Sequence, residues 1–209
     1  MISQDRAAPE ILALDAMGVL YAAGDDVGEL LVPFVSANGG SPDTRAEVEA
    51  IYTEASLGRL SAAEIWRRVG LDAELEDRYL AGHRLAPGVR QCLEWAAGHF
   101  GSICCISNDV DEWSTKLRER FGLERYIRNW FISSEIGARK PDRKIFLVAL
   151  ERLGTTAGQV LFVDDRVRNL DAAARLGMRT VLLSPAPVSG HAHQWVPALD
   201  QLPRLMQSA

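Results

Sequence analysis

Four short runs of apolar residues alternate along the chain with longer segments that have helical periodicity. The runs are ILAL at 11–14, SICCIS at 102–107, QVLFV at 159–163 and TVLL at 180–183. After Pro141, apolar residues recur every three to four positions until Gly154, a typical helix stop, and Gly177 ends another helical stretch. Short strands that alternate with helices predict an α/β fold built on a parallel sheet.

Residues 21–86 have a different pattern, with helical signals and no clear strand. Two pairs of side chains have the spacing of the capping boxes that open helices, Thr44 with Glu47 and Ser61 with Glu64. We therefore expect a small helical domain at 21–86, inserted after the first strand, and an α/β domain formed by residues 1–20 and 87–209. Pro87 is expected to open the first helix after the chain returns to the α/β domain.

The composition is that of a globular protein and gives no sign of a nucleic-acid or membrane partner. Of the 209 residues, 47% are hydrophobic, which suffices for a packed core, and the net charge of −5 comes without a basic block. No apolar run reaches the roughly 18 residues of a membrane span, and the N-terminus lacks the layout of a signal peptide. Cys92, Cys104 and Cys105 have no metal-binding spacing, and the adjacent pair is poorly placed for a disulfide, so we expect a protein of the reducing cytoplasm.

Polar side chains follow the apolar runs, at the points where the predicted strands end. Asp15 follows the first run, Ser107 closes the second, and Asp164 and Asp165 follow the third. The carboxyl ends of parallel strands form the ligand-binding edge of an open sheet, so these groups are expected to meet there. Carboxylates gathered at one edge repel one another unless a cation lies among them, and oxygen ligands favour Mg²⁺. With Lys140, placed in a loop by the proline after it, this pattern outlines a phosphoryl-transfer site.

Each of these residues has a structural alternative when it is considered alone. Asp15 could cap a helix or a turn, and one of Asp164 and Asp165 could be the N-cap of the helix that follows them. Asp109 is expected to cap the helix after the second run, and Lys140 could be an ordinary solvated lysine. The case for a common site therefore depends on the occurrence of all these polar residues at the ends of neighbouring strands.

That combination resembles the haloacid dehalogenase-like (HAD) superfamily. Its four motifs occur in order as LALDAMGVLY, CCISND, GARKPD and VLFVDDRVRNLDAAARLGM, and the resemblance covers residues from about 10 to 185. It implies a Rossmann-like parallel sheet flanked by helices. The stretch EASLGRLSAAEIW is similar to the cap of the subgroup whose α-helical cap follows the first motif, so residues 21–86 are expected to be that cap.

The resemblance also implies a role for each motif residue. Asp15 would be the nucleophile that forms an aspartyl-phosphate, Ser107 would bind the transferring phosphoryl group, and Lys140 would neutralise both. Asn108 would offer its backbone N–H to a phosphate oxygen. The expected Mg²⁺ ligands are Asp15, the main-chain carbonyl of Met17, and Asp164, with Asp165 in or beside the coordination shell. Asn169 stands where many relatives carry another acid, and we do not expect it to be a ligand.

Met17 departs from the pattern of most phosphatases in this superfamily, which carry a second aspartate at that place. That aspartate protonates the leaving oxygen and then deprotonates the attacking water, whereas a thioether has no exchangeable proton. General acid–base catalysis is worth about 10²–10⁴ in rate, so the expected loss is roughly 3–5 kcal/mol of transition-state stabilisation. Four polar residues just downstream are candidates to replace it: Tyr21, Asp25, Asp26 and Glu29.

Three functions remain open at this point. The first is an Mg²⁺-dependent phosphatase of a small phosphorylated metabolite, the second a binding or regulatory protein on a catalytically weakened scaffold, and the third a 2-haloacid dehalogenase-type hydrolase. Retention of the motif residues favours the phosphatase, and Met17 favours the second function. Dehalogenases of the superfamily work without metal and lack paired acids in the fourth motif. Phosphonate hydrolases need a cap lysine, and residues 21–86 contain none.

Other charged residues have less specific patterns. The proposed cap carries arginines that could bind a second anionic group of the substrate or simply form solvated helix faces: Arg45, Arg59, Arg67, Arg68, Arg78 and Arg84. His83, near the end of this segment, could serve as an acid at the hinge of the cap, but it is expected at the surface. His191 and His193 could bind a metal, or could lie in an ordinary loop of the Pro/Gly-rich tail.

Overall fold

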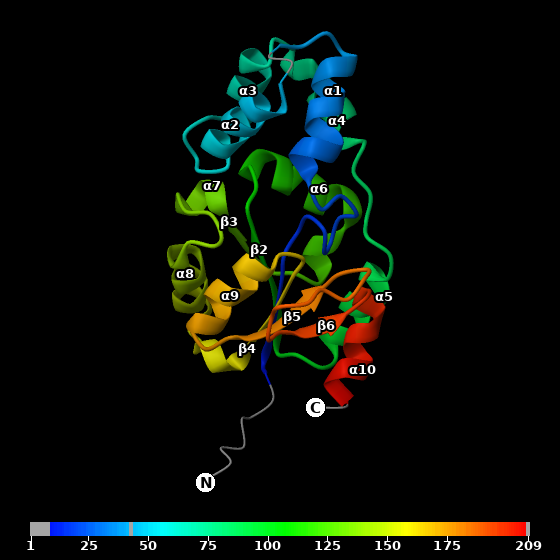
Figure 1. The fold of residues 1–209 in the computed structure, drawn as a ribbon, viewed down its shortest axis with the longest axis vertical. Helices are drawn as coiled ribbons and strands as arrows, with labels where there is room; N and C mark the ends of the chain where they lie inside the picture. Colours follow the sequence, from blue (N-terminus) through cyan, green and yellow to red (C-terminus); the bar gives the residue numbers. More distant parts are fainter. Residues whose placement is uncertain (1–8, 42–43, 208–209) are drawn as a thin grey trace.

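The computed structural model describes residues 9–41 and 44–207 and contains a sheet of six strands (Figure 1). The strands are β1 (Ile11–Leu14), β2 (Ser102–Ser107), β3 (Asn129–Ile132), β4 (Val160–Asp164), β5 (Arg179–Leu183) and β6 (Gln194–Val196). Their order across the sheet is β3-β2-β1-β4-β5-β6, and every neighbouring pair is parallel. The predicted α/β fold with a parallel sheet is therefore confirmed.

The two strands that the sequence pattern misses, β3 and β6, lie at the edges of the sheet. β3 begins at the exposed Asn129, and β6 has only three residues, so neither has a long apolar run. The tail that the pattern marks as a loop thus contributes a strand. Just before β6, His193 contacts Thr180 Oγ1 at 2.7 Å and Asp171 Oδ1 at 3.1 Å. Among the described residues, neither it nor His191 belongs to a group that could hold a metal.

Helices cover both faces of the sheet, and β1 is therefore buried along its whole length (Figure 1). The helices outside residues 21–86 are α5 (Val89–Ala97), α6 (Asp111–Phe121), α7 (Ser133–Ile136), α8 (Arg143–Leu153), α9 (Val167–Arg175) and α10 (Leu202–Gln207), with 3₁₀ turns at Leu123–Arg125, Ala157–Gln159 and Leu199–Gln201. Residues of α5 and α6 belong to one core, and residues of α8 and α9 belong to the other.

Strand side chains alternate between these two cores, as the pleat of a strand requires. Cys105 lies in the core with α5 and α6, whereas Cys104 lies in the core with α8 and α9. Cys92 is buried on α5, and all three cysteines are free thiols. α5 begins at Val89 and not at Pro87, because Gly88 between them has a left-handed φ of +80°.

Residues 21–86, hereafter the helical segment, lie beyond the sheet at the top of Figure 1. They form a π-helical turn at Val27–Leu31, α1 (Val32–Ala37), α2 (Arg45–Ala55), α3 (Ala62–Arg68), a 3₁₀ turn at Ala73–Leu75 and α4 (Glu76–Leu80). As predicted, Thr44 and Ser61 cap α2 and α3. In the described part of this segment, strand-like pairing is limited to the isolated bridges of Tyr21. The division of the chain into two domains stays a prediction.

The helices themselves are short. Among the described residues, none combines the length and apolar character that crossing a membrane requires.

Candidate active site

The carboxyl ends of the central strands bring the predicted polar residues together. β1 lies between β2 and β4, and Leu14 is paired with Cys105 on one side and Val163 on the other. Asp15 follows β1 directly, so it lies beside the ends of both neighbouring strands. The chain runs from β1 to β2 and later reaches β4 on the opposite side. This edge is therefore the switch point at which open α/β sheets bind ligands.

Lys140 joins Asp15 to Asp164 in a buried cluster of charges. Its Nζ lies 2.7 Å from Oδ1 of Asp15 and 2.8 Å from Oδ2 of Asp164, and all three side chains are buried. Lys140 is thus not a solvated lysine. Burial raises the pKa of Asp15 well above its usual value, and Asp164 and Asp165 add to the rise against the opposing charge of Lys140. One ammonium group does not balance these carboxylates.

The same carboxylates have the geometry of a metal site. One oxygen from each of Asp15, Asp164 and Asp165 lies within 4.8 Å of the other two. Burial raises the pKa of Asp165 to about 6, with a contribution from Asp164, and Oδ1 of Asp165 is buried without a hydrogen-bond partner among the described residues. Asn169 donates from its side-chain nitrogen to both oxygens of Asp164 at 3.0 Å, which orients that carboxylate. Three converging carboxylates fit a hard cation such as Mg²⁺.

The residues that sequence analysis considered as N-caps of α6 and α9 are not the N-caps of these helices. The N-cap of α9 is Arg166, although Asp164 does accept the Arg166 N–H at 2.8 Å. The N-cap of α6 is Val110, so the expectation that Asp109 caps this helix is wrong. Asp109 is instead a buried carboxylate whose Oδ1 accepts the Val110 N–H at 2.7 Å.

Ser107 and Asn108 lie beside the charge cluster at the end of β2, and both line the pocket described below. The Ser107 hydroxyl is buried and has no hydrogen-bond partner in the described structure, which leaves it free for a ligand. The Asn108 side chain donates to the Lys140 carbonyl at 2.9 Å and accepts the Lys140 N–H at 2.7 Å. Sequence reasoning assigned Asn108 only a backbone role, whereas its side chain fixes the loop that carries Lys140.

Met17 and Gly18 form the turn after Asp15. Met17 lines the pocket, and Gly18 has a φ of +77°. A Cβ atom at Gly18 would lie 2.5 Å from Oδ2 of Asp165, far inside contact distance. A glycine directly after the Met17 position, next to the predicted nucleophile, is typical of a turn that lets the backbone approach a phosphate. In the structure, the space that the missing side chain leaves is taken by the Asp165 carboxylate.

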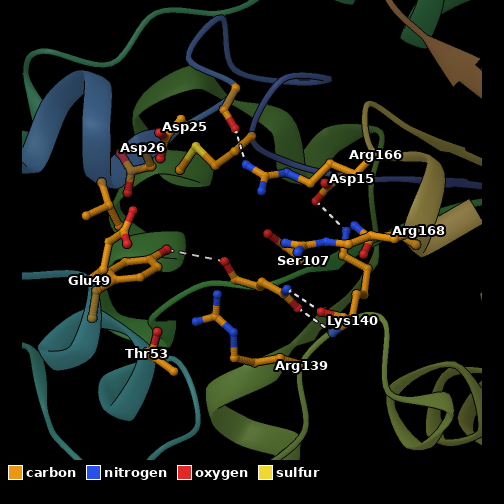
Figure 2. Close-up of a pocket in the computed structure, with 16 residues that line it drawn as sticks. Asp15, Asp25, Asp26, Glu49, Thr53, Ser107, Arg139, Lys140, Arg166 and Arg168 are labelled. Carbon is orange, nitrogen blue, oxygen red and sulfur yellow. Dashed lines mark hydrogen bonds and ion pairs between the residues drawn. The ribbon is translucent and has the colours of Figure 1, made fainter. Parts of the chain in front are cut away.

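A pocket of about 260 Å³ opens over these residues, between the sheet edge and the helical segment. Arg139, Arg166 and Arg168 point into it from the side of Asp15 and Lys140 (Figure 2). Burial lowers the pKa of Arg139, and the charges of Arg166 and Arg168 lower it further, so the three guanidinium groups repel one another. None of the six arginines proposed from the helical segment lines this pocket. Sequence analysis missed Arg139, Arg166 and Arg168, and the signal that could have found them is their position inside the third and fourth motifs.

The opposite wall of the pocket is acidic. Asp25, Asp26 and Glu49 face the arginines across the cavity (Figure 2). Asp25 is paired with Arg45 at 2.5 Å, and Asp26 accepts from the hydroxyl of Tyr79 at 3.0 Å.

Of the four candidates to replace the missing aspartate, Asp25 and Asp26 line the pocket, whereas Tyr21 and Glu29 do not. His83 contacts Asp26 through Nε2 at 3.0 Å and is only 1% exposed. The expectation of a surface histidine is therefore wrong.

The fold, the site at the switch point and the order of the motifs together indicate a hydrolase of the haloacid dehalogenase-like class. Comparison with known sequences supports this assignment. A profile of haloacid dehalogenase-like hydrolases matches residues 9–177, and the chain belongs to this family. The phosphoglycolate phosphatase of Pseudomonas savastanoi pv. phaseolicola is 30% identical over 193 residues, which cover 84% of this chain and 70% of the relative. The phosphoglycolate phosphatase of Pseudomonas syringae pv. tomato is also matched over 70% of its length, at 26% identity, whereas several other curated relatives are matched over less than two thirds of theirs, 54% in one case.

Solved structures share the fold. The HAD phosphatase of Thermococcus onnurineus superposes with a TM-score of 0.72 at 21% identity, over 94% of this chain and 97% of that one. YfnB of Bacillus subtilis, a putative HAD hydrolase solved with magnesium, gives a TM-score of 0.71 at 17% identity, over 96% and 99% of the two chains.

Proposed function

We propose that this hydrolase is an Mg²⁺-dependent phosphatase that acts on a small phosphorylated metabolite through an aspartyl-phosphate on Asp15. The observation that carries the proposal is the buried Lys140 ammonium held between Asp15 and Asp164, next to the unpartnered hydroxyl of Ser107. A pure binding scaffold gains nothing from a buried excess of carboxylates, because burying them is costly. The relative named as a phosphoglycolate phosphatase supports the same reaction class.

In this mechanism the Asp15 carboxylate attacks the phosphorus atom and displaces the substrate oxygen. Lys140 holds Asp15 in position and neutralises charge on the phosphoryl group, while the Ser107 hydroxyl donates to one of its oxygens. Asp15, Asp164, Asp165 and the Met17 carbonyl would hold Mg²⁺, which supplies further charge neutralisation when bound. Water then attacks the acyl-phosphate and regenerates Asp15.

The pocket favours a small substrate that carries a second anionic group. Its volume of about 260 Å³ suits a compact metabolite, and Arg139, Arg166 and Arg168 form a cationic wall beside the phosphate position. Guanidinium groups pair well with carboxylate or phosphate oxygens, so a phosphorylated organic acid or a bisphosphate fits this wall.

Hydrolysis of an aryl phosphate tests the proposal, because an aryl leaving group hardly needs protonation and should tolerate Met17. We expect phosphate release that requires Mg²⁺, is abolished by EDTA and is lost in Asp15→Asn. Asp77→Asn, at a carboxylate exposed outside the pocket, is the matched control and should keep the wild-type rate. Equal background rates for the wild type and Asp15→Asn would rule out the proposed phosphatase function.

A further inference from the structure

The proposed reaction lacks a proton donor for the leaving oxygen, because Met17 occupies the usual place. The attacking and leaving oxygens lie roughly in line through phosphorus, so the leaving oxygen faces away from Asp15. Across the cavity from Asp15 and Lys140 lies α2, which carries Glu49 and Thr53 on the pocket wall (Figure 2). A replacement acid is therefore expected on this side.

Glu49 and Tyr52 are titratable residues of α2 that line the pocket, and Tyr52 is the one that contacts the end of β2, beside the phosphate position. Its hydroxyl lies 3.2 Å from the carbonyl oxygen of Asn108, one residue from Ser107, and 3.5 Å from Oδ1 of Asp109. The ring stacks on Trp113 of α6 at a centroid distance of 6.2 Å, and the Arg139 guanidinium lies 5.7 Å from the ring centroid. These contacts fix the ring, so the hydroxyl is held where helical segment and sheet edge meet.

Asp109 is a buried carboxylate that the proposed mechanism leaves unused. It is 1% exposed, and its Oδ2 has no hydrogen-bond partner in the described structure. Burial raises its pKa to about 7, with a contribution from Asp26, while the Val110 N–H, His83 and Tyr52 oppose the rise. A carboxyl group of this kind exchanges a proton near neutral pH, which is the property that acid–base catalysis needs.

We propose that Tyr52 is the general acid–base of the reaction and that Asp109 is the proton store behind it. This inference rests on the phosphatase function proposed above. Hydrogen bonds of catalytic groups are often long without substrate, so the 3.5 Å between Tyr52 and Asp109 is compatible with a relay that tightens when substrate binds.

The protons balance over the two steps. As Asp15 attacks phosphorus and the bond to the leaving oxygen breaks, that oxygen takes the Tyr52 hydroxyl proton, and Tyr52 takes the proton held by Asp109. Water then attacks the aspartyl-phosphate, and the bond between phosphorus and Asp15 breaks. The water gives one proton to Tyr52 as Tyr52 returns its own to Asp109. The products are an alcohol and inorganic phosphate, and the relay is restored.

Asp25 and Glu49 also line the pocket, but both are paired with Arg45, which leaves Asp26 as the competing donor. Both of its oxygens already accept from the Tyr79 hydroxyl at 3.0 Å, and Oδ1 also contacts His83. These contacts hold the Asp26 carboxylate against Tyr79 and His83, whereas the Tyr52 hydroxyl is held at the end of β2 by the Asn108 carbonyl.

The test compares an alkyl phosphate with an aryl phosphate in Tyr52→Phe. We expect kcat/KM for the alkyl substrate to fall by about 10²-fold or more, with a change of less than about threefold for the aryl substrate. Tyr79→Phe is the matched control, because Tyr79 is an equally buried tyrosine outside the pocket lining that donates to Asp26, and the variant should treat both substrates alike. An equal fall for both substrates in Tyr52→Phe overturns the relay, as does a selective alkyl loss in Asp26→Asn instead.

A second readout needs no variant in the pocket. Both substrates experience equally the titratable and charged groups that face Tyr52 and Asp109, which are Asp15, Tyr21, Asp26, Tyr79, His83, Cys105 and Arg139. The ratio of alkyl to aryl rates in the wild type should therefore fall above about pH 7, as Asp109 loses its proton, and should be low and flat in Asp109→Asn. A pH-independent wild-type ratio overturns the relay alone. Absence of any Asp15-dependent aryl hydrolysis overturns the phosphatase function as well.

Discussion

The ammonium group of Lys140 lies 2.7 Å from the Asp15 carboxylate, and both groups are almost completely buried. Breaking a buried ion pair by removing one partner leaves an uncompensated charge, which typically costs 3–5 kcal/mol. Lys140→Met should therefore lower the free energy of unfolding by about that amount and abolish aryl phosphate hydrolysis. Denaturant unfolding and the aryl assay measure both effects.

Lys144→Met is the control for this prediction, since Lys144 is exposed at the start of α8. It should change stability by less than about 0.5 kcal/mol. Comparable losses in the two variants would contradict the importance assigned to the buried pair.

Gly18→Ala should damage both stability and catalysis. The new Cβ atom would meet Asp165 at 2.5 Å, and the backbone at Gly18 is left-handed. Gly154→Ala has a similar φ of +62° but nothing within 4 Å of the new atom, so it isolates the backbone cost of about 1–2 kcal/mol. We expect Gly18→Ala to exceed that cost and to weaken Mg²⁺-dependent activity, measured as the Mg²⁺ concentration for half-maximal rate. An effect no larger than that of Gly154→Ala would show that Asp165 simply moves aside.

Arg168→Gln tests the cationic wall. Arg168 is exposed into the pocket, and a charge-assisted hydrogen bond is worth about 1.5–3 kcal/mol. KM for a phosphorylated carboxylic acid should rise about tenfold or more, while KM for a phosphate ester with a neutral tail should hardly change. Arg175→Gln, on the same helix outside the pocket lining, should leave both values as they are. Equal changes for the two substrates would show that Arg168 does not bind a second anionic group.

Met17→Asp restores an acid at the usual place. It should raise the turnover of alkyl phosphates more than that of aryl phosphates, within the 10²–10⁴-fold range of acid–base catalysis. In the Tyr52→Phe background the same change should recover the lost alkyl activity, since the new carboxyl replaces the phenol. A uniform gain for both substrates would contradict the role assigned to position 17.

Asp109→Asn should change how stability depends on pH. The pKa of Asp109 in the folded protein, about 7, lies above its ordinary value of 3.8, so the folded state binds more protons than the unfolded state between these values. This group therefore destabilises the wild type progressively from about pH 4 to pH 7, by up to roughly 4 kcal/mol. The variant lacks that penalty, so its stability relative to the wild type should improve between pH 5 and pH 8 in denaturant titrations. A constant difference would mean that Asp109 ionises normally.

The sequence predicts the central strands and the charge cluster well, for physical reasons. β1 and β2 are buried on both faces, so each appears as an unbroken apolar run, and a polar residue marks where it ends. The edge strands β3 and β6 lack such runs. Short polar motifs next to strand ends are local signals, and the sheet topology then brings them together.

Contacts between distant segments could not be predicted in the same way. Tyr52 and Asp109 are 57 positions apart, and Tyr52 resembles any apolar residue of an amphipathic helix. Asp109 has the residue type and position of a helix cap, and only its burial shows otherwise. His83 likewise gives no local sign that Asp26 lies against it.

Because all three cysteines are buried, their alkylation can report local unfolding of the protein. Alkylating reagents attack the thiolate, and burial raises the pKa of Cys104 to about 12 and that of Cys92 also to about 12. Labelling is therefore slow until the surrounding structure separates. Because Cys92 lies on α5 and Cys104 on the opposite side of the sheet, mass spectrometry of pulse-alkylated protein can tell detachment of that helix from rupture of the sheet, without any engineered label.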